Sequence, residues 1–397
     1  MHVMWVSHFP VFGGPHNLML RLADGLAEAG IRSSALLPDE PGSARDRLTA
    51  AGLPVVTCDL PRIRRTRDVR VQAGFVARSL GVVDRIRRVL VDHDVDVVIV
   101  GGLANPASAI AAHRLGRAVV WQILDTSTPR LAVDAVLPLV RRCADTVMLN
   151  GEALRQHHLG GEPLPQSTFV FAGAVDTAQM RPSETLRRQT RARCGVPPEA
   201  LLVGTVANRN PQKGIEWFIR AAGPIHRRRP DAWFLISGAA YANHAGYEAL
   251  LARERAASGV PPERWIVTDE PPRDWYPALD VKCITSIPAS EGTTTTALEA
   301  MACELPVVAT DVGAVREVVL DGVTGTIVPP LDAAAIAAAV IELADRPERR
   351  AQMGAAGRRR VRERFDLGAC VATHVAAIEQ AQAVRRSRAG QTTGARA

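Results

Sequence analysis

The sequence has almost no lysine and few aromatic residues. Lysine occurs only as Lys213 and Lys282 among 48 Lys and Arg residues, and aromatic residues make up 4% of the chain. The net charge of +7 is therefore carried by arginine, which is spread along the chain. Such an excess of arginine over lysine indicates a compositional bias rather than a selected patch, which argues against nucleic acid or an anionic membrane as a partner. One local exception could face anionic lipid, although a solvated loop also explains it: Arg62, Arg64, Arg65, Arg67 and Arg70.

Long apolar runs and paired cysteines are missing as well. No apolar run reaches the roughly 18 residues of a membrane span, and the first residues, MHVMWVSHFP, lack the plan of a signal peptide. We therefore expect a cytoplasmic protein with no stable membrane insertion. Cysteine spacing predicts neither a disulfide framework nor a metal site; the six residues are Cys58, Cys143, Cys194, Cys283, Cys303 and Cys370.

What is present is a long alternation of strands and helices. A chain of 397 residues with 47% hydrophobic residues suits two domains of nearly equal size. Short Val- and Ile-rich runs alternate with helical patterns in both halves, which predicts doubly wound parallel sheets. Ligands of such sheets bind at the carboxyl ends of the strands. In the first half the candidates at these ends are Gly13, Gly14, Gly101, Asn105, Asp125 and Thr126.

The most informative stretch is residues 290–325, SEGTTTTALEAMACELPVVATDVGAVREVVLDGVTG. An apolar run precedes it and a helical pattern follows Thr293–Thr296, so the order is strand, loop, helix, with a threonine hydroxyl as the predicted N-cap. Free amide groups at such a helix start attract anions. Glu291 and Glu299 flank this start, and carboxylates accept hydrogen bonds from sugar hydroxyls. A ligand with both phosphate and sugar hydroxyls fits this pattern.

The loop 207–214, ANRNPQKG, adds positive charge to a second strand-to-helix junction. A lysine and an arginine in such a loop can stabilise the charge that develops on a diphosphate when it leaves. Lys213 and Arg209 are therefore candidate catalytic residues.

Together these motifs resemble the donor site of family-four glycosyltransferases of the GT-B type. The matching features are Glu291 and Glu299 with seven residues between them, the strand at 306–310, Gly313, Glu317, and residues 322–325. The resemblance implies that Glu291 contacts the donor sugar and Glu299 the ribose. It also places the Gly13-Gly14 loop at the donor phosphates and the base near Trp265 and Ile266. Asn208 stands where many members carry the arginine that we assign to Arg209. The donor-binding residues implied are Gly13, Gly14, Asn208, Arg209, Lys213, Trp265, Ile266, Glu291, Gly292, Thr293, Thr294, Thr295 and Glu299.

The implied fold is α/β, with two Rossmann-like domains facing across a cleft. The predicted boundaries are an acceptor-side domain at 1–175, a linker at 176–200, and a nucleotide-sugar-binding domain at 201–365. A helix at 366–384 is expected to return to the first domain, and a disordered tail is expected at 385–397.

The implied function is transfer of a hexosyl sugar from a UDP- or GDP-sugar, UDP being favoured, to an acceptor hydroxyl. Retention of anomeric configuration follows from the resemblance, and no metal or other cofactor is expected. Many members carry an acceptor-side histidine where this chain reads Leu124-Asp125. Asp125 is then a catalytic candidate that orients the acceptor, unless the site is built differently. We expect a small-molecule or oligosaccharide acceptor, with a lipid-linked or polysaccharide acceptor as the alternative.

Other functions remain open for this architecture. A nucleotide-sugar epimerase needs acid and base groups that the sequence does not identify, and a sugar phosphorylase needs a longer chain. A non-catalytic nucleotide-sugar-binding protein fits the missing histidine and the shifted arginine. A hydride-transferring dehydrogenase is disfavoured, because no Gly-x-Gly-x-x-Gly motif follows the first strand.

Overall fold

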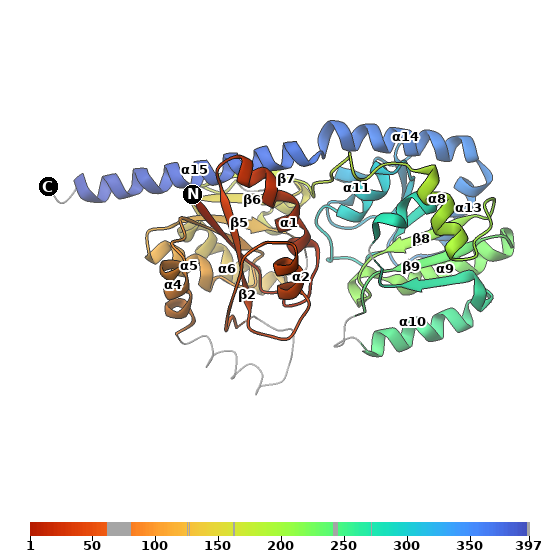
Figure 1. Ribbon diagram of the computed structural model, residues 1–397, viewed down its shortest axis with the longest axis horizontal. Coiled ribbons are helices and arrows are strands. Elements are labelled where there is room, and N and C mark those ends of the chain that lie inside the picture. Colours follow the sequence, from red (N-terminus) through yellow and green to blue (C-terminus); the bar gives the residue numbers. More distant parts are fainter. Residues whose placement is uncertain are drawn as a thin grey trace. The chain divides into compact units, whose positions relative to one another are not determined.

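The computed structural model describes residues 1–61, 81–124, 126, 128–161, 163–240, 245–270 and 272–394 (Figure 1). The arginine cluster at 62–70 and Asp125 lie outside these residues. The chain divides into two compact units, Met1–Ala172 with Leu367–Ala397 (unit 1) and Gly173–Asp366 (unit 2). Each unit is built on one parallel sheet, so the structure is the predicted two-domain Rossmann-like α/β fold.

Unit 1 contains a seven-stranded sheet in the order β3-β2-β1-β4-β5-β6-β7. Its adjacent strands are all paired in parallel. The strands are β1 (His2–Val6), β2 (Arg32–Pro38), β3 (Val55–Cys58), β4 (Val97–Gly101), β5 (Ala118–Ile123), β6 (Thr146–Asn150) and β7 (Ser167–Phe171). The helices that connect or cover them are α1 (Gly14–Glu28), α2 (Ala44–Ala50), α4 (Val82–Asp92), α5 (Ala107–Arg114), α6 (Arg130–Cys143), α7 (Ala153–Leu159) and α15 (Leu367–Gly394).

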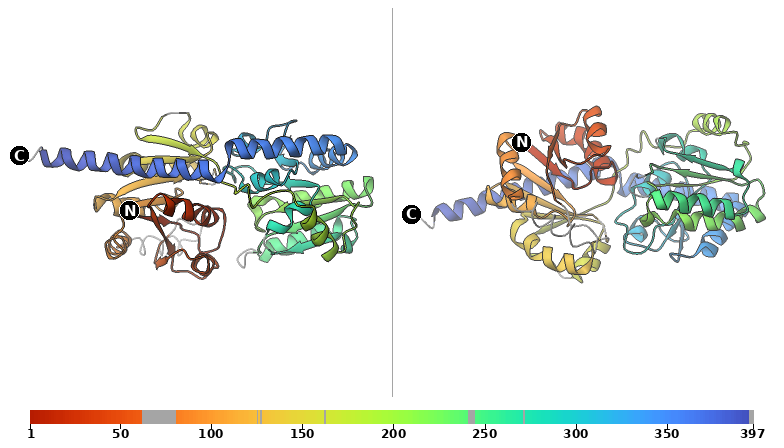
Figure 2. Two further views of the ribbon diagram at one scale, coloured as in Figure 1. Left: turned by 45° about the horizontal axis from the view of Figure 1, so that its top comes forward. Right: turned by 90° about the horizontal axis from the view of Figure 1, so that it is seen from below.

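The last helix of the chain completes unit 1. α15 contacts β5, β6, β7 and α1, and Figures 1 and 2 show it lying along this unit. The helix predicted at 366–384 falls within α15. The stretch 385–394, which we expected to be disordered, is a continuation of the same helix. Its arginines are anchored rather than free, since Arg385 donates to the carbonyl of His113 and Arg388 pairs with Asp145 at 2.8 Å.

Unit 2 contains a six-stranded parallel sheet in the order β10-β9-β8-β11-β12-β13. The strands are β8 (Leu202–Val206), β9 (Trp233–Ser237), β10 (Trp265–Thr268), β11 (Val281–Ile284), β12 (Val307–Thr310) and β13 (Gly325–Val328). The α-helices are α8 (Glu184–Arg193), α9 (Ile215–Arg228), α10 (Ala245–Ala257), α11 (Thr295–Ala302), α12 (Val315–Val318), α13 (Ala333–Asp345) and α14 (Pro347–Arg364). Short 3-10 turns lie at Pro211–Lys213, Pro262–Arg264, Pro272–Asp274 and Tyr276–Ala278.

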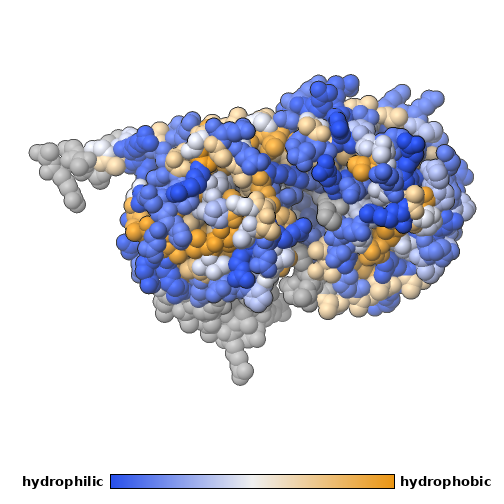
Figure 3. All heavy atoms as spheres, viewed as in Figure 1, coloured by the Kyte–Doolittle hydropathy of each residue, from blue (hydrophilic) through white to orange (hydrophobic). Residues whose placement is uncertain are grey.

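Helices cover both faces of the unit 2 sheet, as a buried parallel sheet requires. α9 and α13 pack on one face, where the core includes Phe218 and Val340, and α11 packs on the other face with Leu298 and Met301. Hydrophilic side chains dominate the surface over α14 in Figure 3, where Arg359 and Arg362 are exposed.

The predicted linker at 176–200 is a structured part of unit 2. Ser183 caps α8 by accepting a hydrogen bond from the amide of Leu186 at 3.2 Å. Two arginines of α8, Arg187 and Arg191, each donate to Asp280 at 2.7 Å, and the Arg191 side chain is only 3% exposed. The segment is rich in arginine, but these two side chains turn inward because they bind the carboxylate of Asp280.

We predict that Asp280→Asn destabilises the protein strongly. The Asp280 side chain is 9% exposed, so the substitution leaves the buried Arg191 without its counter-charge, a loss of about 3–5 kcal/mol in the free energy of unfolding. Asp311→Asn is the matched control, because the Asp311–Arg316 pair is 44% and 58% exposed, and it should cost at most about 1 kcal/mol. Chemical denaturation checks both, and equal losses would contradict the anchoring role.

Candidate functional site

Two loops meet at the carboxyl edge of the unit 2 sheet. The loop 207–214 follows β8, and the loop 285–294 follows the adjacent strand β11. They are joined where the amide of Ile287 donates to the carbonyl of Gln212 at 3.0 Å. Gly214 makes this approach possible, because its φ is +54° and a Cβ there would lie 2.2 Å from the carbonyl oxygen of Thr285.

The contact between these loops places Lys213 against Glu291. The Lys213 Nζ lies 2.6 Å from Glu291 Oε1, and the Ser286 hydroxyl donates to the same oxygen. The Glu291 side chain is 8% exposed and the Lys213 side chain 28% exposed. Glu291 is therefore held by two donors, while the lysine remains accessible to a ligand.

The backbone of Gly313 packs against the backbone of Glu291. Its φ is +55°, and a Cβ would lie 2.1 Å from the Glu291 carbonyl oxygen. The spacing between Glu291 and Gly313 in the motif thus has a packing reason, since the loop after β12 passes directly against the backbone of Glu291.

Glu299 lies one turn inside α11 and is almost fully buried. Its Oε2 accepts a hydrogen bond from the Tyr276 hydroxyl at 2.6 Å, and the two residues are 4% and 0% exposed. A buried carboxylate whose orientation is fixed by such a hydrogen bond can accept a hydroxyl from a ligand.

The threonines at the start of α11 have separate roles. Thr294 is the N-cap residue, as the pattern predicted, but its side chain makes no capping bond, and its buried Oγ1 has no hydrogen-bond partner. Thr293 accepts from the amide of Gly173 at 3.2 Å, and Thr295 packs so closely on Gly173 that a Cβ there would lie 2.4 Å from its Oγ1. These contacts connect Gly173, at the start of unit 2, to the start of α11. Gly292, which precedes Thr293 in the chain, is buried. The helix start keeps an unused hydroxyl and unpaired amides that suit an anion.

Arg209, in the same loop as Lys213, binds a carboxylate of α10. Its Nε donates to Glu248 on α10 at 3.0 Å, and its Nη1 donates to the carbonyl of Gly238. The Arg209 side chain is 11% exposed, and its positive charge is balanced by the carboxylate of Glu248. The role predicted for Arg209 at a diphosphate stays a prediction, and in this structure its guanidinium is engaged by Glu248 of α10. Asn208 precedes it in the loop.

Trp265 is mainly a packing residue. Its ring lies 5.1 Å from that of Phe234 and 6.4 Å from that of Phe218, within the core beneath α9. Trp265 and Ile266 belong to β10, the strand at one edge of the sheet. Binding of a nucleotide base near them, through their backbone groups, stays a prediction.

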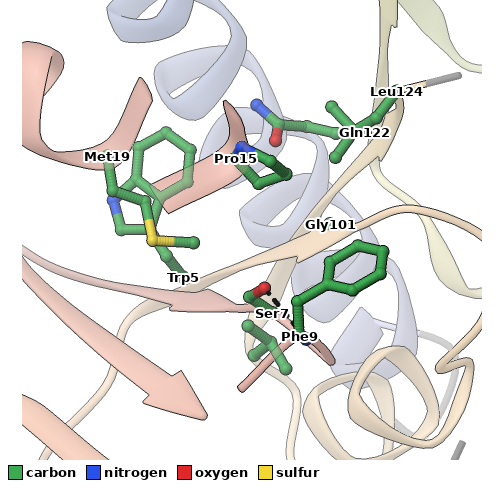
Figure 4. A pocket seen from close by; sticks show the side chains of 9 residues that line it. Trp5, Ser7, Phe9, Pro15, Met19, Gly101, Gln122 and Leu124 are labelled. Atoms are coloured by element: carbon green, nitrogen blue, oxygen red, sulfur yellow. Dashed lines mark hydrogen bonds between the residues drawn. The ribbon is translucent and has the colours of Figure 1, made fainter. Parts of the chain in front are cut away.

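Unit 1 has a small hollow at the carboxyl ends of β1, β4 and β5 (Figure 4). Its side chains come from these strands, the loop after β1 and the first turns of α1. The lining residues are Trp5, Val6, Ser7, Phe9, Pro15, Met19, Gly101, Gln122 and Leu124. The polar groups in it are few, the amide of Gln122 being the largest.

The predicted unit 1 residues are distributed around this edge. Gly13 has an extended φ of −157°, and a Cβ on Gly13 or Gly14 would meet no atom within 4 Å. Neither turn geometry nor packing thus requires these glycines, which favours space for a ligand at the start of α1. Asn105 is 2% exposed and both its amide atoms lack partners, while Thr126 is 4% exposed. Asp125 lies outside the described residues.

Sequence reasoning missed a buried pair beneath the hollow, Gln122 and His374. The Gln122 Nε2 lies 3.2 Å from His374 Nε2, and His374 Nδ1 lies 2.8 Å from the carbonyl of Cys370 on α15. Burial lowers the pKa of His374 to about 4, so the ring is neutral and accepts from Gln122. No local pattern links residues so distant in sequence.

Neither a metal cluster nor a membrane span is found in the part of the chain that the structure describes. No group of three or more His, Cys, Asp or Glu side chains there is arranged to hold an ion. Within the same ranges, every helix falls short of the length or the apolarity that a membrane crossing needs.

Both units match models of known protein families. Residues 197–346 match "Glycosyl transferases group 1", and residues 13–165 match "Glycosyl transferase 4-like domain". These ranges contain the Lys213–Glu291 pair and five of the residues that line the unit 1 hollow, Pro15, Met19, Gly101, Gln122 and Leu124.

Relatives and solved structures point the same way. A GDP-mannose-dependent alpha-(1-6)-phosphatidylinositol monomannoside mannosyltransferase of Mycolicibacterium smegmatis is 31% identical over 74% of this chain and 78% of its own. A D-inositol 3-phosphate glycosyltransferase of Streptomyces scabiei is 31% identical over 62% of this chain, but the match spans only 56% of that relative. The crystal structure of Anabaena Alr3699/HepE with UDP superposes with a TM-score of 0.79 at 19% identity, over 96% of this chain and 100% of that one, which is a likeness of fold.

We predict that Gly313→Ala disturbs Glu291, whereas Gly322→Ala does not. Both glycines have positive φ, +55° and +73°, so each alanine costs about 1–2 kcal/mol of stability from the backbone alone. Only the Cβ at 313 meets the Glu291 backbone, since nothing lies within 4 Å of one at 322. Gly313→Ala should therefore lose more stability in chemical denaturation, and equal losses would show that this contact relaxes without strain.

Proposed function

The chain belongs to the group 1 glycosyltransferases of the family-four, GT-B type, and we propose from this that it transfers a hexosyl sugar from a UDP- or GDP-sugar to a hydroxyl of an acceptor. The observation that carries the proposal is the Lys213–Glu291 contact of 2.6 Å beside the start of α11. It joins a cation for phosphate, a carboxylate for sugar hydroxyls and free helix amides in one place.

The roles of the donor-site residues follow from their chemistry. Lys213 would lie against the diphosphate and stabilise the charge that develops as it leaves the anomeric carbon. Glu291 would orient the sugar, and Glu299, held by Tyr276 at 2.6 Å, would accept from the ribose. The start of α11, with the unpartnered Thr294 hydroxyl, would add hydrogen-bond donors to a phosphate oxygen.

We further propose that the anomeric configuration is retained and that no metal takes part. The proposal is supported by the family membership, and by Lys213 and the amide groups at the start of α11, which offer positive charge to a diphosphate without a metal ion. Proton NMR of the product gives the anomeric configuration, and addition of EDTA should leave the rate unchanged.

The acceptor is proposed to be a polyol or sugar hydroxyl of a small molecule or oligosaccharide. One relative is named as acting on D-inositol 3-phosphate, which supports a small phosphorylated polyol. A lipid-linked acceptor is the second candidate, favoured by the match of 31% over 74% of the chain to a phosphatidylinositol monomannoside mannosyltransferase.

We predict that one class of nucleotide sugar raises the melting temperature of the protein and that Glu299→Ala removes the effect. A ligand that binds only the folded state must stabilise it. A panel of UDP-, GDP- and TDP-sugars is measured by thermal shift, with Glu342→Ala as control, because Glu342 is an exposed partner of Arg346.

Three outcomes are distinct. Stabilisation of wild type and control but not of Glu299→Ala supports the donor site. No shift with any nucleotide sugar for a well-folded protein would overturn the proposed function. Binding without turnover on any acceptor would favour a non-catalytic nucleotide-sugar-binding protein.

We predict that Lys213→Met lowers kcat about 100-fold, because it removes a preorganised charge at the leaving group. Its Glu291 partner keeps the Ser286 hydroxyl, so the fold should persist. Arg220→Met is the matched control, since Arg220 pairs with Glu254 on the outer side of α9. Initial rates with saturating donor test this, and a Lys213→Met rate within about threefold of wild type would exclude this role.

A further inference from the structure

The second lysine of the chain is buried in the centre of the unit 2 sheet. Lys282 lies on β11 with 1% of its surface exposed, between Gly204 of β8 and Val307 of β12. Its Nζ donates to the carbonyl of its neighbour Cys283 at 2.6 Å. No carboxylate of the described residues lies within ion-pair distance of this ammonium. A strand position of this kind is ordinarily apolar, because a buried unpaired charge is costly.

Lys282 lies on the face of the sheet that carries α11. Alternate residues of a strand point to the same face, so Lys282 shares its face with Ile284. Ile284 packs in one cluster with Leu298 and Met301 of α11. The ammonium is therefore on the side of β11 from which Glu299 reaches the candidate donor site.

Charged groups of that site act on Lys282. The pKa of Lys282 is lowered to about 7, chiefly by burial. The charge of Lys213 contributes to this lowering, whereas Cys283, Glu299 and Glu291 oppose it. Cys283 lies on the same strand, and its own pKa is raised by burial. The adjacent strands contribute only Gly204 and Val307 at this level.

The cations that the described residues bring to this site are already paired with carboxylates. Lys213 is already in contact with Glu291, and Arg209 is neutralised by Glu248. Glu299 adds a second carboxylate. A diphosphate brings further negative charge into the same region, and at close range a buried cation stabilises it more than an exposed one does.

We propose that Lys282 supplies further positive charge from beneath the donor site and takes up a proton from solvent when the nucleotide sugar binds. Lys282 does not touch the donor in this arrangement and acts through its charge. The inference rests on the proposed function, since it requires a diphosphate beside Lys213.

The direction of the pH effect follows from the position of the proton. At pH values below 7 the lysine is charged with or without donor, and donor affinity is at its maximum. As the pH rises above this value, the free protein loses the proton, so binding must recover it and affinity falls. Proton uptake on binding is greatest in this range, approaching about one proton per donor.

The test is calorimetric titration of wild type, Lys282→Met and Arg228→Met with the nucleotide sugar that stabilises the wild type. A nucleotide sugar carries no group that titrates near neutral pH, so it adds no proton change of its own. Measurements from about pH 6 to about pH 8 in two buffers of different ionisation enthalpy give both affinity and proton uptake. Arg228 is a suitable control because its pair with Asp345 lies at the surface, where its side chain is 65% exposed.

We expect Lys282→Met to bind the donor about tenfold more weakly below pH 7, without proton uptake and without the fall at higher pH. Its melting temperature should be equal to or above that of wild type, because a buried charge is replaced by an apolar chain of similar length. Arg228→Met should behave as wild type in all these measurements.

The opposite results are equally clear. Unchanged affinity and proton uptake in Lys282→Met, or a lower melting temperature with an intact pH profile, would make Lys282 merely structural and leave the proposed function standing. If Lys282→Met fails to fold, the wild type alone decides, since absence of proton uptake would overturn the inference. Absence of any binding to wild type would overturn the proposed function together with it.

Discussion

The ion pair between Lys213 and Glu291 is the interaction on which the candidate site depends. It joins loops that follow β8 and β11, neighbours in the sheet but far apart in the sequence. Gly214 and Gly313 exist at their positions because the backbone passes too closely there for a side chain. The two glycines therefore define the site as much as the charged residues do, since they decide where the charged residues can meet.

Several arginines of unit 2 are paired with carboxylates of the same unit. Arg209 is bound to Glu248, and the arginines of α8 are bound to Asp280. Arg209 lies beside the site, whereas the α8 arginines lie at the opposite, amino end of the sheet, and all of them hold the fold together. The two lysines, one accessible and one buried, are the cations that we propose act on the donor.

Unit 1 presents a different kind of edge. Its hollow is lined mainly by apolar side chains and rests on the neutral Gln122–His374 pair. Asn105 keeps unpartnered amide atoms close to the end of β4. A surface with a few convergent polar groups on an apolar floor suits a polyhydroxylated molecule with an uncharged face.

The sequence by itself determined the alternation of strands and helices, the strand–loop–helix at Glu291, and the Lys213-Gly214 dipeptide at a strand-to-helix loop, because these are local patterns. It could not place Arg209, whose partner Glu248 lies on another helix, nor show that residues 184–193 form a helix anchored on Asp280. It also gave no sign of Gln122 meeting His374, or that Lys282 is buried beneath Glu299. These contacts join residues distant along the chain, so only the tertiary structure decided which charges remain available to a ligand.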